Sequence, residues 1–175
     1  MKTLILGGAR SGKSRLAECL AQASQLPVVY LATAVAGDAE MQARIERHRA
    51  HRPDHWTLIE EPLALAGVLR AQAQAQHCLL VDCLTLWLTN LLLHPDPERL
   101  PQECAALLTA LPTLPGRLIL VSNETGLGVV PMGALSRRYV DAAGELHQAL
   151  AVMCEQVLFT VAGLPQILKG EPTWT

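Results

Sequence analysis

Short aliphatic runs alternate with longer segments of helical periodicity along this chain. Continuous apolar stretches with the length of a strand lie at residues 2–6, 28–33, 78–81, 118–122 and 157–161. Strands of this kind are typical of a sheet that is covered on both faces. Segments with the helical period lie at residues 13–24, 38–51, 62–76, 84–93, 98–110 and 133–154. The alternation predicts an α/β fold with a mostly parallel sheet and helices on both faces.

Weaker patterns complete this prediction. Residues 56–60 are predicted to form an extra edge strand, and residues 166–169 a short closing strand. The Ala/Gln run at 71–76 is interpreted as the solvated end of a helix, because both residues are good helix formers. No repeat, linker or change of composition divides the 175 residues, so a single domain is expected.

Composition excludes several classes of protein. Half of the residues are apolar, yet there are only three Trp, two Tyr and one Phe, and the net charge is −2. A chain without a basic field and with few aromatics is not expected to bind nucleic acid. The apolar stretch 84–93 is much shorter than the ~20 residues of a membrane span, and the apolar start is too brief for a secretory signal. Five cysteines without a CxxC pair indicate reduced core thiols in a cytoplasmic protein, with no structural zinc.

The sequence GGARSGKS, from Gly7 to Ser14, matches the Walker A pattern G-x-x-x-x-G-K-[ST] between a strand and a helix. Backbone amides of such a loop and the following helix N-terminus bind phosphates. We expect Lys13 to reach the β and γ phosphates and the Ser14 hydroxyl to bind Mg²⁺. A glycine turn with an incidental Lys-Ser pair is the alternative, and the strand and helix on either side disfavour it. The predicted nucleotide ligands of the loop are Gly7, Gly8, Ala9, Arg10, Ser11, Gly12, Lys13 and Ser14.

A carboxylate follows a second buried strand. The run Leu79-Leu80-Val81-Asp82 carries Asp82 to the carboxyl edge of the sheet, where open α/β sheets bind ligands. Asp82 is therefore predicted to hold Mg²⁺, directly or through water. A role as N-cap of the next helix is the alternative, and the two roles are compatible.

Residues 44–55 read RIERHRAHRPDH and contain four of the eleven arginines and three of the six histidines. A helix that carries these charges repels itself unless it meets anions, so a phosphate chain is its expected partner. A solvated basic helix is the alternative. A histidine beside a nucleotide can also attack phosphorus and form a phosphoramidate. The spacing does not decide between a nucleophile and a phosphate clamp.

Taken together, these segments resemble the bifunctional cobinamide kinase / cobinamide-phosphate guanylyltransferase family. The resemblance covers nearly the whole chain in order, through GGARSGKS, YLATA at 30–34, the basic helix, and the segments at 79–92, 121–131 and 136–151. It implies a RecA-like P-loop fold and a homotrimer. It also implies that ATP or GTP phosphorylates the aminopropanol hydroxyl of adenosylcobinamide. GMP from GTP then passes through an enzyme histidine to adenosylcobinamide phosphate, which gives adenosylcobinamide-GDP and pyrophosphate.

The resemblance also implies individual roles. The guanylylated histidine of the family corresponds to His48, and two acidic site positions correspond to Glu60 and Asp82. Some members of the family carry glutamate at the position of Asp82. His147 stands where asparagine is frequent and receives no role. Asn123 and Glu124 follow another strand, and either position water, metal or the corrinoid hydroxyl or form a turn. The implied nucleotide contacts are Ala32, Thr33 and Ala34, the last where serine is common, together with Arg49, Ala50, His51 and Arg52.

Two other functions are compatible with a P-loop. One is a small-molecule kinase without the guanylyl step, and the other is a regulatory nucleotide-binding ATPase. A regulatory ATPase is expected to present an apolar surface or an interaction tail to partners, and the sequence shows neither plainly. The preference of the kinase step for ATP or GTP and the corrinoid-binding residues stay open at this point.

Overall fold

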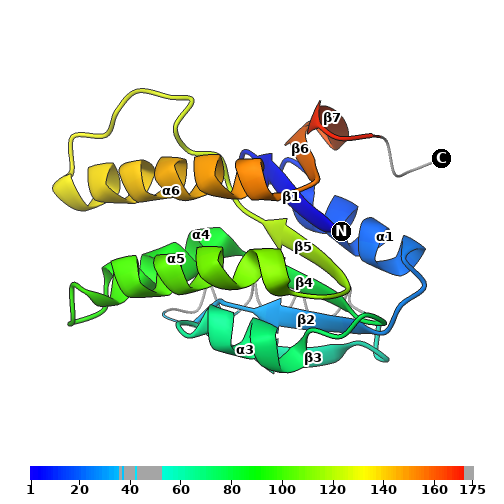
Figure 1. Cartoon of the computed structure of the whole chain (residues 1–175). Helices are drawn as coiled ribbons and strands as arrows, with labels where there is room; N and C mark the ends of the chain where they lie inside the picture. Colours follow the sequence, from blue (N-terminus) through cyan, green and yellow to red (C-terminus); the bar gives the residue numbers. More distant parts are fainter. Residues whose placement is uncertain (36, 38–41, 43–52, 172–175) are drawn as a thin grey trace.

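The computed structural model describes residues 1–35, 37, 42 and 53–171. In this part of the chain a seven-stranded sheet has the order β3-β2-β4-β5-β1-β6-β7 (Figure 1). Neighbouring strands are parallel except β6 and β7, which are antiparallel. The mostly parallel sheet and its two predicted edge strands are confirmed. The strands are β1 (Lys2–Gly7), β2 (Val28–Ala32), β3 (Thr57–Glu60), β4 (Cys78–Asp82), β5 (Arg117–Val121), β6 (Gln156–Val161) and β7 (Leu164–Lys169).

Helices cover both faces of the sheet, as predicted. Side chains alternate between the faces along each strand: Leu118 and Leu120 pack into one core, and Ile119 and Val121 into the other. The first core includes residues of α3, α4, α5 and α6, and the second includes residues of α1. None of the described helices is long and apolar enough to cross a membrane. The helices are α1 (Lys13–Ala23), α3 (Leu65–Gln72), α4 (Leu84–Leu92), α5 (Arg99–Ala110) and α6 (Ala134–Met153), with a short 3₁₀ turn at Leu111–Thr113.

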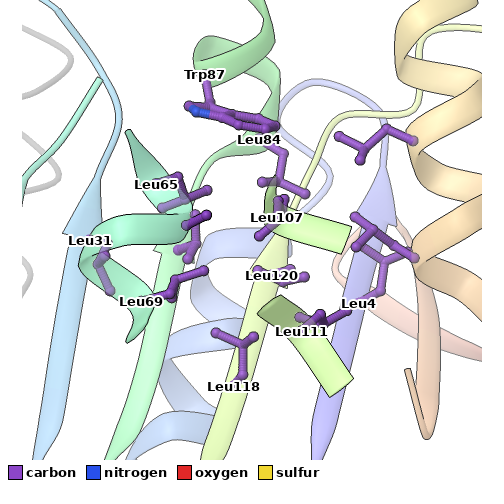
Figure 2. Packing of buried hydrophobic residues seen from close by; sticks show 14 of the residues in the cluster. Leu4, Leu31, Leu65, Leu69, Leu84, Trp87, Leu107, Leu111, Leu118 and Leu120 are labelled. Atoms are coloured by element: carbon purple, nitrogen blue, oxygen red, sulfur yellow. The ribbon is translucent and has the colours of Figure 1, made fainter. Parts of the chain in front are cut away.

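The larger core is built mainly from leucine, in keeping with the scarcity of aromatic residues. Figure 2 shows leucines of the strands and of the covering helices in one layer beside Trp87. Trp87 is fully buried, and its indole N–H donates to the Leu63 carbonyl at 2.8 Å. Each buried leucine contributes about 1.5–3 kcal/mol from removal of its surface from water. This core fixes the carboxyl ends of the central strands relative to one another.

The helix predicted at residues 62–76 is shorter in the structure. It ends at Gln72, and Ala73 has an extended backbone with ψ of 120°. Gly116 passes so close that a Cβ there would lie 2.2 Å from the Gln74 carbonyl oxygen. The interpretation of residues 71–76 as a helix end is therefore wrong beyond Gln72. Close packing of two connections against each other overrides the helix propensity of Ala and Gln.

All five cysteines are free thiols. The pKa of Cys104 is raised to about 11 and that of Cys154 to about 12, mainly because both thiols are buried. Both therefore stay protonated at neutral pH. Cys19 is exposed, because a helix rotates its position away from the buried Ala17 and Leu20. The prediction of core thiols is wrong for Cys19.

Candidate active site

The carboxyl ends of the central strands bring several predicted site residues to one edge of the sheet. Asp82, the last residue of β4, pairs with Ala32 on one side and with Val121 on the other. Val121 in turn pairs with Ile5 of β1, two residues before the glycine loop. Asp82, the segment after β5 and the glycine loop therefore lie along the edge where open α/β sheets bind ligands.

The glycine loop at residues 7–14 is anchored on both sides. The Gly7 carbonyl accepts the backbone N–H of Glu124, at 2.9 Å, from the segment that follows β5. The Ser11 carbonyl accepts the backbone N–H of Gly163, at 2.8 Å, from the turn between β6 and β7. These bonds hold the loop in shape through its neighbours in the sheet.

Two glycines let the loop adopt this shape. A Cβ at Gly7 would lie 2.4 Å from the Thr160 carbonyl oxygen, which is shorter than any van der Waals contact. Gly12 has a φ of +99°, in the left-handed region that other residues adopt only with strain. Helix α1 begins at the next residue, Lys13, so its first N–H groups open at the end of the loop. This geometry suits a phosphate group.

Lys13 concentrates positive charge at the loop. The side chain is only 7 % exposed. Its ammonium group donates to the Gly8 carbonyl at 2.6 Å and to the Ser11 hydroxyl at 3.4 Å. Because both acceptors belong to the loop, the charge lies within its curve, where the sequence predicts phosphates.

Asp82 and Ser14 provide a donor set suited to Mg²⁺. Asp82 is half-buried and accepts a hydrogen bond from the Tyr30 hydroxyl at 3.1 Å, while Ser14 lies half-buried in the first turn of α1. One carboxylate and one hydroxyl fit a magnesium ion that takes its other ligands from phosphates and water. No cluster of three His, Cys, Asp or Glu occurs among the described residues. The alternative N-cap role is not observed, because Cys83 holds that position in α4.

Thr33 connects the ends of β2 and β4 through its fully buried side chain. Its hydroxyl donates to the Cys83 carbonyl at 2.6 Å and accepts the Cys83 N–H at 3.0 Å. The Asn90 side-chain amide donates to the Thr33 carbonyl at 2.8 Å. A nucleotide contact from Thr33, which the resemblance implies, would therefore come from its backbone and not from its hydroxyl.

Replacement of Thr33 by valine is expected to lower the free energy of unfolding by about 1–3 kcal/mol, because the N–H and carbonyl of Cys83 lose their partner. Urea denaturation followed by circular dichroism measures the change. Thr33→Ser keeps the hydroxyl and is expected to stay closer to the wild type. Equal stability of the valine variant and the wild type would contradict this account.

Three other predicted residues, Ala32, Ala34 and Glu60, lie along the same edge. Ala32 pairs with Glu60 of β3 and with Asp82 of β4, so these three residues form one row. Glu60 is exposed, and Ala34 is half-buried just beyond the end of β2. The structure brings Glu60 and Asp82 to the same edge, two strands apart.

The basic segment lies outside the described residues, and with it nearly all of the helix predicted at 38–51. The described chain resumes at residue 53, shortly before the buried Trp56. The Trp56 ring stacks on that of Tyr30, whose hydroxyl bonds to Asp82. The chain just past the basic segment is thus connected to the acidic residue of the site. The predicted residues that lie outside the description are His48, Arg49, Ala50, His51 and Arg52.

A network of polar side chains behind the site was not predicted from the sequence. The imidazole of His147, on α6, has its Nε2 2.8 Å from the Ser122 hydroxyl and its Nδ1 3.4 Å from a Glu124 oxygen. Burial lowers the pKa of His147, which favours the neutral ring. The sequence did indicate Glu124 as a residue after a strand. Its partnership with His147 depends on how α6 packs and has no signal in the spacing.

The segment from β5 to α6 projects from the body of the protein (Figure 1). Its apolar side chains are strongly exposed, with Leu127 at 79 %, Val129 at 98 % and Met132 at 95 %. The expectation that the chain presents no apolar surface is therefore wrong. The sequence did not indicate this surface, because its apolar residues are few and stand among glycines and polar residues. Only the fold shows that nothing in the described chain covers them.

An open pocket of about 420 Å³ lies at the base of this segment. Its lining is mostly apolar, and its polar residues include Tyr139 and Thr125, which follows Glu124 in the chain. Burial raises the pKa of the Tyr139 phenol, which therefore stays protonated at neutral pH. The lining residues are contributed by α4, α6 and the projecting segment, among them Thr89, Leu92, Thr125, Pro131, Tyr139 and Val140.

Solved structures with a similar fold are only distantly related in sequence. A protein of Pyrococcus horikoshii OT3 matches with a TM-score of 0.53 and 11% identity, over 98% of this chain and 87% of that one. The RadB recombinase matches with a TM-score of 0.52 and 18% identity, over 90% of this chain and 73% of that one. These likenesses show a RecA-like P-loop NTPase fold and confirm the predicted fold class.

Sequence comparison covers almost the whole chain. A "Bifunctional adenosylcobalamin biosynthesis protein CobP" from Pseudomonas aeruginosa is 71% identical over 172 residues, which are 98% of this chain and 99% of that protein. A "Bifunctional adenosylcobalamin biosynthesis protein CobU" from Escherichia coli is 38% identical, over 97% of this chain and 100% of that protein. The sequence model of the family "Cobinamide kinase / cobinamide phosphate guanyltransferase" matches residues 3–168. The chain therefore belongs to the cobinamide kinase / cobinamide phosphate guanyltransferase family, and the resemblance seen in the sequence is confirmed.

Proposed function

We propose that this chain phosphorylates the aminopropanol hydroxyl of adenosylcobinamide with ATP or GTP, and then transfers GMP from GTP to the resulting phosphate. The products of the second reaction are adenosylcobinamide-GDP and pyrophosphate. The observation that carries the proposal is the match to a bifunctional family over residues 3–168, together with a glycine loop shaped for phosphate. Free thiols throughout the chain fit a cytoplasmic enzyme.

In the kinase step the glycine loop holds the triphosphate. Backbone N–H groups at the start of α1 and the Lys13 ammonium neutralise charge on the β and γ phosphates while the acceptor hydroxyl attacks in line. Ser14 and Asp82 are the residues that would hold Mg²⁺, which supplies further neutralisation of phosphate charge when bound. Glu60 and the backbone of Ala32, Thr33 and Ala34 lie along the edge on the side of β2 and complete the proposed nucleotide contacts.

In the guanylyl step the neutral imidazole of His48 attacks the α phosphorus of GTP. A phosphorus–nitrogen bond forms, and pyrophosphate leaves with the electron pair of the broken phosphorus–oxygen bond. The phosphate of the corrinoid then attacks the same phosphorus and releases the imidazole. Arg49 and Arg52 are proposed to stabilise the phosphate charge, and Ala50 and His51 to contact the nucleotide.

Separate labelling of GTP in the α and γ phosphates tests this proposal. With the α label, we expect protein-bound radioactivity that is labile to acid and stable to alkali, as a phosphoramidate is. With the γ label and cobinamide, we expect labelled corrinoid phosphate. Labelled corrinoid without labelled protein would instead favour a kinase that lacks the guanylyl step. Absence of both products would favour a regulatory ATPase.

We propose further that the chain forms a homotrimer, as the resemblance implies, and that the projecting segment takes part in the contact. Its exposed apolar side chains support this assignment. Light scattering coupled to size exclusion is expected to give three times the chain mass of 18.9 kDa. Val129→Ser with Met132→Ser is expected to shift the mass toward that of one chain. An unchanged trimer in this variant would exclude the segment from the contact.

A further inference from the structure

Glu124 is the accessible end of the polar network behind the site. His147 links the Ser122 hydroxyl, at 2.8 Å from Nε2, to a Glu124 oxygen, at 3.4 Å from Nδ1. The order of the groups is that of a Ser-His-acid triad. Ser122, however, is fully buried, so no substrate reaches its oxygen. The Glu124 side chain is 20% exposed and is the member that a substrate can contact.

The network holds the Glu124 carboxylate firmly. One oxygen lies beside the imidazole, and the other accepts the backbone N–H of Gly126 at 2.6 Å. A neutral imidazole whose Nε2 accepts the Ser122 hydroxyl proton carries its own N–H on Nδ1, toward Glu124. The network therefore fixes the direction of the carboxylate without placing a full positive charge against it.

The backbone of Glu124 lies against the glycine loop. Its N–H donates to the Gly7 carbonyl at 2.9 Å, and the N–H of the preceding Asn123 donates to the Thr85 hydroxyl at 2.7 Å. Strand β5, which ends just before it, stands between β1 with the loop and β4 with Asp82. The Glu124 backbone therefore lies between the glycine loop and the end of β4, which carries Asp82.

The proposed reactions differ in their need for a base. Formation of enzyme–GMP uses a neutral imidazole, and the second transfer uses a phosphate that is already ionised at neutral pH. The phosphorylation alone begins from a neutral alcohol, whose proton must leave as the oxygen attacks. Asp82 is bonded to Tyr30 and is assigned to Mg²⁺, and Glu60 lies four strands from β1. Glu124 is the remaining carboxylate among these edge residues.

We propose that Glu124 is the general base of the phosphorylation step and that His147 is its positioning residue; this inference rests on the proposed kinase function. The hydroxyl O–H bond of the acceptor breaks and its proton passes to the Glu124 carboxylate. The oxygen forms a bond to the γ phosphorus, and the bond from that phosphorus to the β-phosphate oxygen breaks. The nucleoside diphosphate leaves with that electron pair.

The Glu124→Gln variant tests the base directly. We expect the kcat for phosphorylation of cobinamide to fall about 100-fold or more, while the KM for ATP stays within about 3-fold of the wild type because no nucleotide contact is lost. Enzyme–GMP formation from GTP, and GMP transfer to cobinamide phosphate supplied ready-made, are expected to keep their rates. Glu98→Gln, an exposed residue before α5, is the matched control for the loss of a carboxylate.

Substitutions of His147 test the positioning role. His147→Leu removes the hydrogen bond to Ser122 and the contact of Nδ1 with Glu124, and is expected to lower the kcat of phosphorylation with little change in enzyme–GMP formation. His147→Asn restores an N–H donor and is expected to recover at least about 10-fold of the rate that leucine loses. Circular dichroism and thermal unfolding of each variant verify that it folds.

Two results would overturn the proposal. If Glu124→Gln phosphorylates cobinamide at the wild-type rate, Glu124 is not the general base. If phosphorylation, enzyme–GMP formation and GMP transfer all slow equally, Glu124 and His147 have a structural role. Failure of the wild type to form enzyme–GMP would instead contradict the guanylyl part of the proposed function. The kinase assay of Glu124→Gln would still decide the role of the carboxylate in that case.

Discussion

Lys13→Ala is expected to lower the rate of corrinoid phosphorylation by about 1,000-fold or more. The ammonium lies within the loop, bonded to the Gly8 carbonyl and close to the Ser11 hydroxyl, and only 7 % of the side chain is exposed. In such a dry site a fixed charge beside the transferring phosphoryl group stabilises the transition state far more than it would in water. The measurement is the initial rate of transfer from γ-labelled GTP or ATP to cobinamide at saturating nucleotide.

Lys169→Ala is the matched control for Lys13→Ala. The Lys169 ammonium also donates to backbone carbonyls, those of Ala151 and Val152 at 2.8 and 2.9 Å, but it lies on β7. The control removes the same charge and the same kind of hydrogen bond outside the loop, so we expect its phosphorylation rate to stay near that of the wild type. If the phosphorylation rate of Lys13→Ala lies within about 3-fold of that of the control, Lys13 does not take part in phosphoryl transfer.

The glycine loop shows what the sequence could predict. Its glycines, its lysine and the strand and helix beside it lie within about two dozen consecutive residues, so the pattern and its structural context are read together. The same holds for Asp82, which directly follows three buried aliphatic residues. Local patterns of this kind also predicted the strands, since a buried parallel strand is a short continuous apolar run.

Contacts between distant residues could not be predicted in this way. Thr33 and Cys83 are 50 residues apart, and they meet because β2 and β4 are neighbours in the sheet. The order of the strands in the sheet cannot be deduced from the hydrophobic pattern of each strand. The resemblance implied a nucleotide contact at Thr33, and only the order of the strands shows that its hydroxyl joins two strand ends.

The network of Glu124 and His147 was hidden for the same reason. His147 lies 23 positions after Glu124, on a helix whose packing against the sheet decides which strand end it meets. From the sequence, a carboxylate followed by Thr-Gly is equally typical of a turn. The structure shows the turn, because the Glu124 carboxylate accepts the N–H of Gly126, and it places the other carboxylate oxygen beside the imidazole.

His48→Ala is expected to abolish the covalent attachment of GMP, because the variant lacks the imidazole that we propose as the nucleophile. The prediction rests on the resemblance, which places the guanylylated histidine at His48, and on the cluster of basic residues around it. Phosphorylation of cobinamide needs no phosphoramidate, so the kinase rate of this variant is expected to stay within about 10-fold of the wild type. The measurement is protein-bound label from α-labelled GTP beside labelled corrinoid from γ-labelled GTP.

His51→Ala is the variant that makes the His48 experiment decisive. His51 lies three residues further along the same predicted helix, so it presents the same chemical group on an adjoining part of the surface. If His48 is the nucleophile, His51→Ala keeps the acid-labile GMP adduct, although its rate of formation falls when a nucleotide contact is lost. If the label persists in His48→Ala and disappears in His51→Ala, His51 and not His48 is the nucleophile. Because both variants remove one imidazole from one short segment, a general loss of basic character cannot account for a difference between them.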